Sequence, residues 1–102
     1  MIVYEVRASV EAAIAADYCV WLQPHIREIL GIPGFEQAEL LIEDSDDGRV
    51  TYSVRYHLDS RAALERYLRD HAPRLRAEAS GRFGERFCAT RRVSELVQVF
   101  DR

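Results

Sequence analysis

The stretch RVTYSVRYHL, residues 49–58, alternates between an apolar row and a polar row. A period of two is typical of a β-strand that buries one face and leaves the other face open. The apolar row consists of Val50, Tyr52, Val54, Tyr56 and Leu58, and the polar row consists of Arg49, Thr51, Ser53, Arg55 and His57. The function therefore depends on whether the polar row faces water, a ligand, a nucleic acid or a second chain.

The segments before this strand show their own periodicity. Residues 2–10 alternate as a first strand, and residues 35–43 predict a second strand that pairs with 49–58. Apolar residues at helical spacing predict a helix from about 12 to 30, in which Pro24 causes a kink or a break into two helices near Gln23. The hexapeptide EDSDDG, residues 43–48, is typical of a hairpin connection with Asp47 and Gly48 at the tight turn.

After residue 58 the chain predicts two helical pieces and a last strand. Asp59 or Ser60 caps the first piece, and Pro73 ends it and opens the second, which stops at Gly84. The last strand runs from about 87 to 93. The order β-α-β-β-α-β predicts an α+β ferredoxin-like fold, in which a four-stranded antiparallel sheet carries its helices on one face, within a single domain of 1–102.

Charge and composition exclude several classes of protein. The net charge is −3, but residues 1–60 carry four arginines against eleven acids, whereas residues 61–92 carry nine arginines against four acids. The acidic half opposes a general nucleic-acid field, and the basic half predicts either a solvated helix surface or a docking site for an acidic partner. No apolar run is long enough to span a membrane, and a strand begins directly at residue 2, so we expect a cytoplasmic protein. Cys19 and Cys88 are expected to be reduced and buried.

An open sheet face in this topology also raises the possibility of RNA recognition. RNA-recognition domains place aromatic rings on the open face of the third strand, where they stack on bases. Here Thr51 and Ser53 stand at the two stacking positions, and the tyrosines belong to the opposite row. The pattern therefore argues against nucleic-acid binding by this face.

Two interpretations of the polar face stay open. In a monomer the polar row is solvated, whereas in a sheet-to-sheet dimer it is enclosed and must satisfy its own charges. For the dimer we expect pairs such as Glu5 with Arg55 or Arg7 with Glu39. The candidate residues of the dimer face are Glu5, Arg7, Ser53, Arg55 and His57.

The helices supply a candidate ligand site. His25 and His71 both lie on apolar helix stripes, where a buried imidazole needs a hydrogen-bond partner. They are either structural residues at the two proline breaks or part of a pocket between helices and sheet. The candidate ligand-binding residues are Trp21, His25, Tyr52, Tyr56, His71 and Arg74, with Arg74 or Arg76 at the mouth for an anion. His25 is the candidate general base, or an axial ligand if haem were bound.

Four segments carry a family resemblance that covers nearly the whole chain. MIVYEV at the start, PHIREIL followed by PGF, VTYSVRY, and HAPRLRAEASGRFGERF resemble a family of short bacterial proteins, domain of unknown function 4286. The resemblance implies a fold similar to the dimeric α/β barrels of the antibiotic-biosynthesis monooxygenase type, in which two ferredoxin-like sheets face each other. It implies a homodimer, and it brings no established activity or catalytic residues.

The residues and the resemblance together lead to one main expectation and two alternatives. We expect a homodimeric protein that binds a small molecule or another protein, without demonstrated catalysis. The first alternative is a cofactor-independent monooxygenase- or isomerase-like enzyme that uses His25 on a small aromatic or enol substrate. The second is an interaction module for an acidic partner. No zinc, nucleotide or hydrolase motif occurs, so no metal and no cofactor are predicted.

Overall fold

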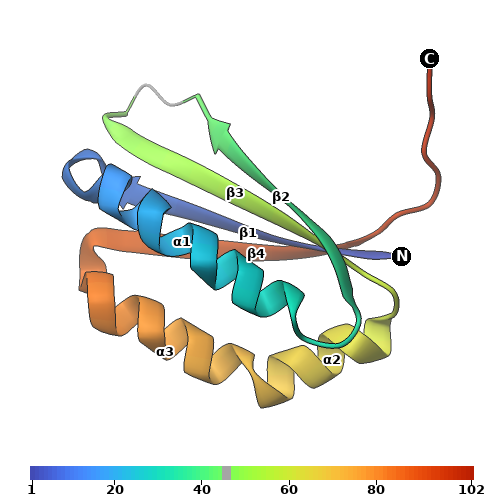
Figure 1. Ribbon diagram of the computed structural model, residues 1–102. Coiled ribbons are helices and arrows are strands. Elements are labelled where there is room, and N and C mark those ends of the chain that lie inside the picture. The colour runs from blue at the N-terminus through green and yellow to red at the C-terminus, as the bar shows by residue number, and fades with distance from the viewer. Residues whose placement is uncertain (45–46) are drawn as a thin grey trace.

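The computed structural model describes residues 1–44 and 47–102, where three α-helices pack on one face of a four-stranded antiparallel sheet (Figure 1). In chain order the elements are β1 (Ile2–Glu11), the 3-10 turn η1 (Ala12–Ile14), α1 (Ala15–Leu30), β2 (Phe35–Glu43), β3 (Arg49–Leu58), α2 (Arg61–Asp70), α3 (Ala72–Phe83), the 3-10 turn η2 (Gly84–Arg86) and β4 (Phe87–Glu95). The α+β ferredoxin-like fold predicted from the order of elements is confirmed.

The strand order β2-β3-β1-β4 makes β1 and β3 the central pair. Glu5 on β1 lies opposite Arg55 on β3 and Arg92 on β4, so the three side chains share one face of the sheet. Arg91, the neighbour of Arg92, belongs to the helix-covered face. The polar row of residues 49–58 therefore lies on the open face, and the apolar row with Tyr52 and Tyr56 lies under the helices, as the alternation predicts.

Helix α1 continues unbroken through Pro24, so the break into two helices that the proline suggested does not occur. Pro24 lies on the exposed side of the helix. The carbonyl that loses its partner there, on Val20, can bind water instead, because Val20 is exposed as well. The buried side of α1 carries Ala15, Tyr18, Leu22, Ile26 and Ile29.

The second helical region follows its predicted caps. The Ser60 hydroxyl accepts a hydrogen bond of 3.1 Å from the amide of Ala63, which makes Ser60 the N-cap of α2. Pro73 lies in the first turn of α3, where its missing N–H costs nothing. Gly34, which precedes β2, has a φ of 97°, and a Cβ at this position would collide with Ala63. A glycine is therefore required where the chain passes close to α2.

Two connecting segments complete the chain. The predicted tight turn lies partly outside the described residues, because 45–46 are not described; within the described part, the amide of Arg49 donates to Asp47 at 3.0 Å. Strand β4 extends two residues beyond its predicted end. The C-terminal arm, residues 96–102, then leaves the sheet after one hydrogen bond from the Leu96 amide to the Met1 carbonyl (Figure 1).

The cysteines differ from one another. Cys19 is half-buried on α1, but Cys88 is exposed, so the prediction that both are buried is wrong for Cys88. Cys88 lies on the edge strand β4 opposite Ser9, in the row that faces away from the helices.

Among the described residues, no helix is long and apolar enough to cross a membrane.

Candidate functional site

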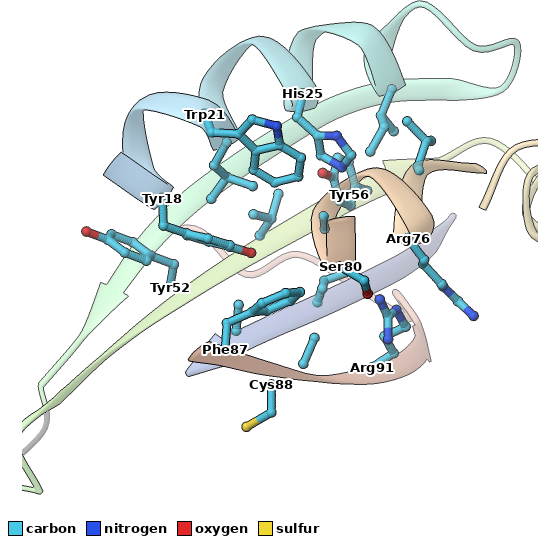
Figure 2. A pocket seen from close by; sticks show the side chains of 18 of the residues that line it. Tyr18, Trp21, His25, Tyr52, Tyr56, Arg76, Ser80, Phe87, Cys88 and Arg91 are labelled. Atoms are coloured by element: carbon cyan, nitrogen blue, oxygen red, sulfur yellow. The ribbon is translucent and has the colours of Figure 1, made fainter. Parts of the chain in front are cut away.

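A cavity of about 340 Å³ lies between α1, α3 and the helix-covered face of the sheet (Figure 2). Five tyrosines, one tryptophan, one phenylalanine and one histidine contribute to its wall. These residues are Tyr4, Tyr18, Trp21, His25, Tyr52, Tyr56, Tyr67 and Phe87. The exposed residues of the wall come from α3, η2 and β4, so the cavity opens to solvent between α3 and β4.

Aromatic rings pack against one another along the inner wall. Trp21 and His25, one turn apart on α1, stack with ring centroids 4.5 Å apart. Tyr18 contacts Phe83 at 5.1 Å and Phe87 at 5.6 Å. Aromatic pairs at such distances stabilise the fold beyond the area they bury. The spacing of Tyr18, Trp21 and His25 along one side of α1 is what brings them to the cavity together.

The tyrosine hydroxyls divide into two groups. The Tyr52 hydroxyl donates to the Ala15 carbonyl at 3.2 Å, and Figure 2 shows it directed away from the cavity. Tyr18, Tyr56 and Tyr67 have no hydrogen-bond partner within the described part of the chain, and Figure 2 shows the Tyr18 hydroxyl pointing inward. Burial raises the pKa of Tyr18 to about 12 and that of Tyr67 to about 12, so both phenols stay protonated and can donate to a ligand.

His25 is half-buried and presents its imidazole to the cavity. Burial lowers its pKa, while the carboxylates of Glu28 and Glu78 oppose this effect and the guanidinium of Arg74 adds to it. Within the described residues its ring nitrogens make no hydrogen bond. The imidazole is therefore neutral at pH 7 and free to accept a proton.

The structure brings four of the six predicted ligand residues together. Trp21, His25, Tyr52 and Tyr56 line the cavity, and so does Arg76, the second arginine considered for its mouth. His71 lies at the junction of α2 and α3, where its ring stacks on Tyr67 at 6.4 Å, and it is not part of the cavity wall.

Arg74 also lies outside the cavity wall. Its Nη1 atom binds Glu28 at 2.9 Å and Glu78 at 3.1 Å, and these two acids hold the guanidinium on the outer surface of α1 and α3. Tyr18, Phe87 and Arg91 belong to the wall but were not among the predicted site residues. The stripe of α1 already contained Tyr18, but only the register of β4 shows which of the two neighbouring arginines faces inward.

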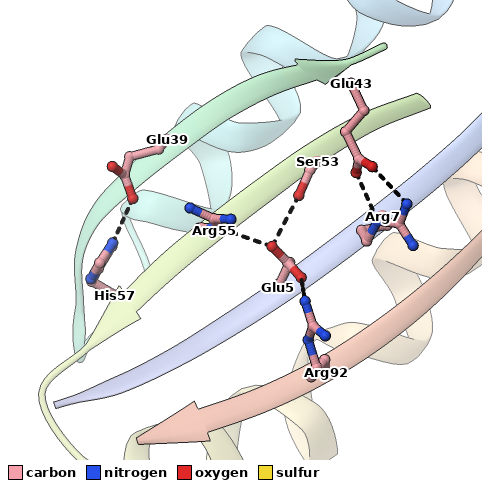
Figure 3. A network of polar contacts seen from close by, with 8 residues as sticks. All are labelled: Glu5, Arg7, Glu39, Glu43, Ser53, Arg55, His57 and Arg92. Atoms are coloured by element: carbon pink, nitrogen blue, oxygen red, sulfur yellow. Dashed lines mark hydrogen bonds and ion pairs between the residues drawn. The ribbon is translucent and has the colours of Figure 1, made fainter. Parts of the chain in front are cut away.

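The open face of the sheet carries the five residues predicted for a dimer contact (Figure 3). The Glu5 carboxylate accepts hydrogen bonds from Arg55 at 2.9 Å, Arg92 at 2.7 Å and Ser53 at 3.2 Å. Glu5 is only 6% exposed and Ser53 only 3%. These bonds, led by that from Arg55, lower the pKa of Glu5 although burial opposes the shift. The expected pair of Glu5 with Arg55 is present.

The other expected pair on this face is wrong. Arg7 binds Glu43 through two hydrogen bonds of 2.7 Å, and Glu39 binds the Nε2 atom of His57 at 2.8 Å. The register alone does not decide between the two acids, because Glu39 lies opposite Arg55 and Glu43 opposite Thr51, each two residues from Ser53, the partner of Arg7. Glu39 is engaged by His57, and Arg7 pairs with Glu43. No cluster of metal-ligating side chains occurs among the residues described.

Together the fold and the cavity define a small ferredoxin-like α+β protein with a ligand-sized space between its helices and its sheet. The sequence matches the profile of the Domain of unknown function (DUF4286) over residues 1–97. The chain belongs to the DUF4286 family. A search of curated proteins by sequence gave no significant match.

Solved structures with the same fold include several oxygenases. A protein of Deinococcus radiodurans, provisionally assigned as an antibiotic biosynthesis monooxygenase, is 15% identical with a TM-score of 0.78, covering 99% of this chain and 97% of that chain. The heme-degrader MhuD of Mycobacterium tuberculosis, with two hemes bound in its active site, is 20% identical with a TM-score of 0.73, covering 99% and 100%. SnoaB, a cofactor-independent oxygenase of Streptomyces nogalater, is 16% identical with a TM-score of 0.69, covering 99% and 98%. At these identities the similarity establishes the fold.

Proposed function

We propose that this protein binds a small aromatic molecule in the cavity between α1, α3 and the sheet. The supporting observation is an open space of about 340 Å³ surrounded by aromatic rings. The cavity opens to solvent, and most of the side chains that form its inner wall are buried aromatic and aliphatic residues. Its volume falls at the lower end of the range for ligand sites, roughly 300–1,000 Å³. A ligand of one or two rings is the best fit.

A pair of alanines on α3 allows a direct test. Ala79 lines the cavity, whereas Ala77 lies on the exposed side of the same helix. We expect Ala79→Phe to fill the space and abolish binding, and Ala77→Phe to bind as the unchanged protein does. Native mass spectrometry of freshly purified protein, compared with the denatured sample, detects a bound molecule. Fluorescence of Trp21, the single tryptophan of the chain, then follows its titration.

The outcomes separate a binding site from an empty void. Equal binding by the Ala79→Phe and Ala77→Phe variants would place the ligand elsewhere. A protein that carries no adduct and shows no response to a panel of aromatic acids, amides and phenols would contradict the proposal. Haem belongs in the same panel, because His25 would be its axial ligand, and a haem spectrum that His25→Leu abolishes would assign the site to haem instead.

We also propose that the protein acts as a homodimer whose two open sheet faces meet. The C-terminal arm supports this, since Val97 is 91% exposed and Phe100 is 83% exposed in the single chain. A contiguous exposed apolar segment is characteristic of an interaction site. A second copy suits the open face as well, because the ion pairs around Glu5 already satisfy its charges internally.

His25 supports a second candidate function, that of a cofactor-independent oxygenase or isomerase. Its neutral imidazole lines the cavity and has no hydrogen-bond partner among the described residues, so it can remove an acidic proton from an enol or a phenol. The catalytic interpretation predicts that His25→Asn retains ligand binding and loses turnover of that ligand under oxygen. Turnover that survives His25→Asn would exclude His25 as the base.

A further inference from the structure

We propose that the ligand of this cavity is an aromatic carboxylate whose carboxylate group is bound by Arg91 and Arg76 at the cavity mouth. The inference rests on the proposed function, because it specifies the chemical class of the ligand for the same cavity. It goes beyond that function by assigning recognition of the charge to two residues from different elements, β4 and α3.

The charge of the cavity wall differs from that of the whole chain. The net charge of the protein is −3, yet two arginines and no aspartate or glutamate line the cavity. Arg91 makes neither an ion pair nor a hydrogen bond with any described residue, and Arg76 makes a single hydrogen bond of 3.2 Å to the Tyr4 hydroxyl. Both guanidinium groups therefore keep donors available for a ligand.

Carboxylates neutralise most of the other arginines near the sheet and α1. The ion pairs are Arg55 and Arg92 with Glu5, Arg7 with Glu43, Arg86 with Glu11, and Arg74 with Glu28 and Glu78. Glu28 and Glu78 also influence the pKa of His25, and Arg74 engages both of them outside the cavity. The positive charge of Arg76 and Arg91 at the mouth is thus left without an internal counter-ion.

Arg91 and Arg76 lie at the rim of the cavity, where Arg91 extends toward Ser80 and Arg76 extends away from the aromatic rings (Figure 2). Figure 2 shows Arg91 and Ser80 on the side of the cavity toward β4 and α3, with the rings of Tyr18, Trp21 and Phe87 forming other parts of the wall. The charge of Arg91 reaches the interior, since it opposes the effect of burial on the pKa of Tyr18. When the ring of an aromatic acid lies among these aromatic side chains, its carboxylate lies at the mouth beside the guanidinium groups. Guanidinium groups bind carboxylates through paired hydrogen bonds.

Calorimetry with 2-naphthoate and 2-naphthamide tests this inference, because the two probes share shape and ring system and differ in charge. We expect the unchanged protein to bind naphthoate at least tenfold more tightly than naphthamide. Arg91→Gln and Arg76→Gln should each weaken naphthoate binding about five- to twentyfold, as expected for the loss of a hydrogen bond to a charged group at a partly exposed site. Neither variant should alter naphthamide binding by more than about twofold.

Arg66→Gln is the matched control. Arg66 is exposed on α2, lies outside the cavity wall and has no ion-pair partner among the described residues, so its replacement removes the same charge without freeing an acid. We expect naphthoate affinity to stay within twofold. An equal loss in Arg66→Gln and Arg91→Gln would show a diffuse attraction by the basic half of the chain and would overturn the assignment.

The two proposals fail in different ways. Equal affinity for naphthoate and naphthamide, with both lost in Ala79→Phe, would retain the cavity as an aromatic site and refute the anion inference. Absence of binding for both probes would contradict both proposals for ligands of this size. Thermal unfolding of each arginine variant verifies that the fold is unchanged before affinities are compared.

Discussion

Arg91 and Arg92 are neighbours on β4 that act on opposite faces of the sheet. Arg92 donates to the Glu5 carboxylate at 2.7 Å on the open face, whereas Arg91 lines the cavity under the helices. The alternation of a strand makes this unavoidable, and a shift of β4 by one residue would exchange the two charges. The pairing of β4 with β1 therefore determines both the ion pairs of the open face and the charge of the cavity.

Replacement of Glu5 by Gln should lower the free energy of unfolding by about 1–2 kcal/mol, because Glu5 is buried while its arginine partners remain partly exposed. Urea unfolding at pH 7 measures this. Glu36→Gln, an exposed acid of β2, is the control and should change the stability by less than about 0.5 kcal/mol. Equal effects of the two substitutions would show that the network around Glu5 adds nothing to stability.

The Glu5 carboxylate should also make the stability of the fold depend on pH, with lower stability in acid. Because the folded state lowers the pKa of Glu5 from its usual 4.5, its contribution is present above that value and is lost as the pH falls through the folded pKa. Urea unfolding between pH 6 and pH 3 should show stability decreasing toward acid, with a smaller decrease in Glu5→Gln. An identical decrease in stability in both proteins would show that Glu5 does not cause the loss of stability in acid.

The effect of His25 on stability should appear in a different pH range from that of Glu5. Burial lowers its pKa below the usual 6.5, so the unfolded chain binds the proton more readily and stability falls as the pH drops below about 6.5. His25→Leu should remove this loss and, because the imidazole has no hydrogen-bond partner among the described residues, should change stability at pH 7 by at most about 1 kcal/mol. Unfolding of His25→Leu at pH 7 would instead indicate an essential core histidine.

Two tyrosines of β3 form a matched pair for a test of hydrogen bonding. Tyr52→Phe removes the bond of 3.2 Å to the Ala15 carbonyl and should cost about 1 kcal/mol. Tyr56→Phe removes a hydroxyl without a partner among the described residues and should change stability by less than about 0.5 kcal/mol. Chemical denaturation of both variants checks the difference, and a larger loss for Tyr56→Phe would reveal an additional partner.

A chain that ends at Leu96 tests the proposed dimer. It keeps the Leu96 hydrogen bond to Met1 but loses the exposed Val97, Val99 and Phe100. Burial of such side chains contributes about 1.5–3 kcal/mol each, so the dimer dissociation constant should rise at least about tenfold. Sedimentation velocity measures it, and circular dichroism verifies the fold. Unchanged association would remove the arm from the interface, and a monomeric unchanged protein would refute the dimer.

Much of the fold follows from local patterns in the sequence. The alternation in residues 49–58 indicates which side chains lie under the helices, and Ser60, Pro73 and Gly84 mark helix ends because each suits a backbone geometry that other residues disfavour. Pro24 was misleading because the helix continues through it, and water can replace the hydrogen bond lost at the exposed Val20 carbonyl. Cys88 was misleading because β4 is an edge strand.

The candidate site was only partly predictable. Trp21, His25, Tyr52 and Tyr56 follow the same helix or strand periodicity as core residues. This periodicity places them on the faces that line the cavity, so the sequence could predict them. Arg74 was misplaced because its side chain is long, and ion pairs with Glu28 and Glu78 from two helices decide where its charged end lies. Such competition between surface partners leaves no pattern in the sequence.

The sequence by itself determined the order of elements, the two faces of each strand and the ends of the helices, because these depend on neighbours within a few residues. Only the tertiary structure decided that an aromatic cavity remains open beneath the helices and that two arginines without counter-ions stand at its mouth. These features depend on the separation of α1 and α3 above the sheet and on the register of β4. They arise from contacts between residues far apart in the chain, such as Arg76 and Tyr4.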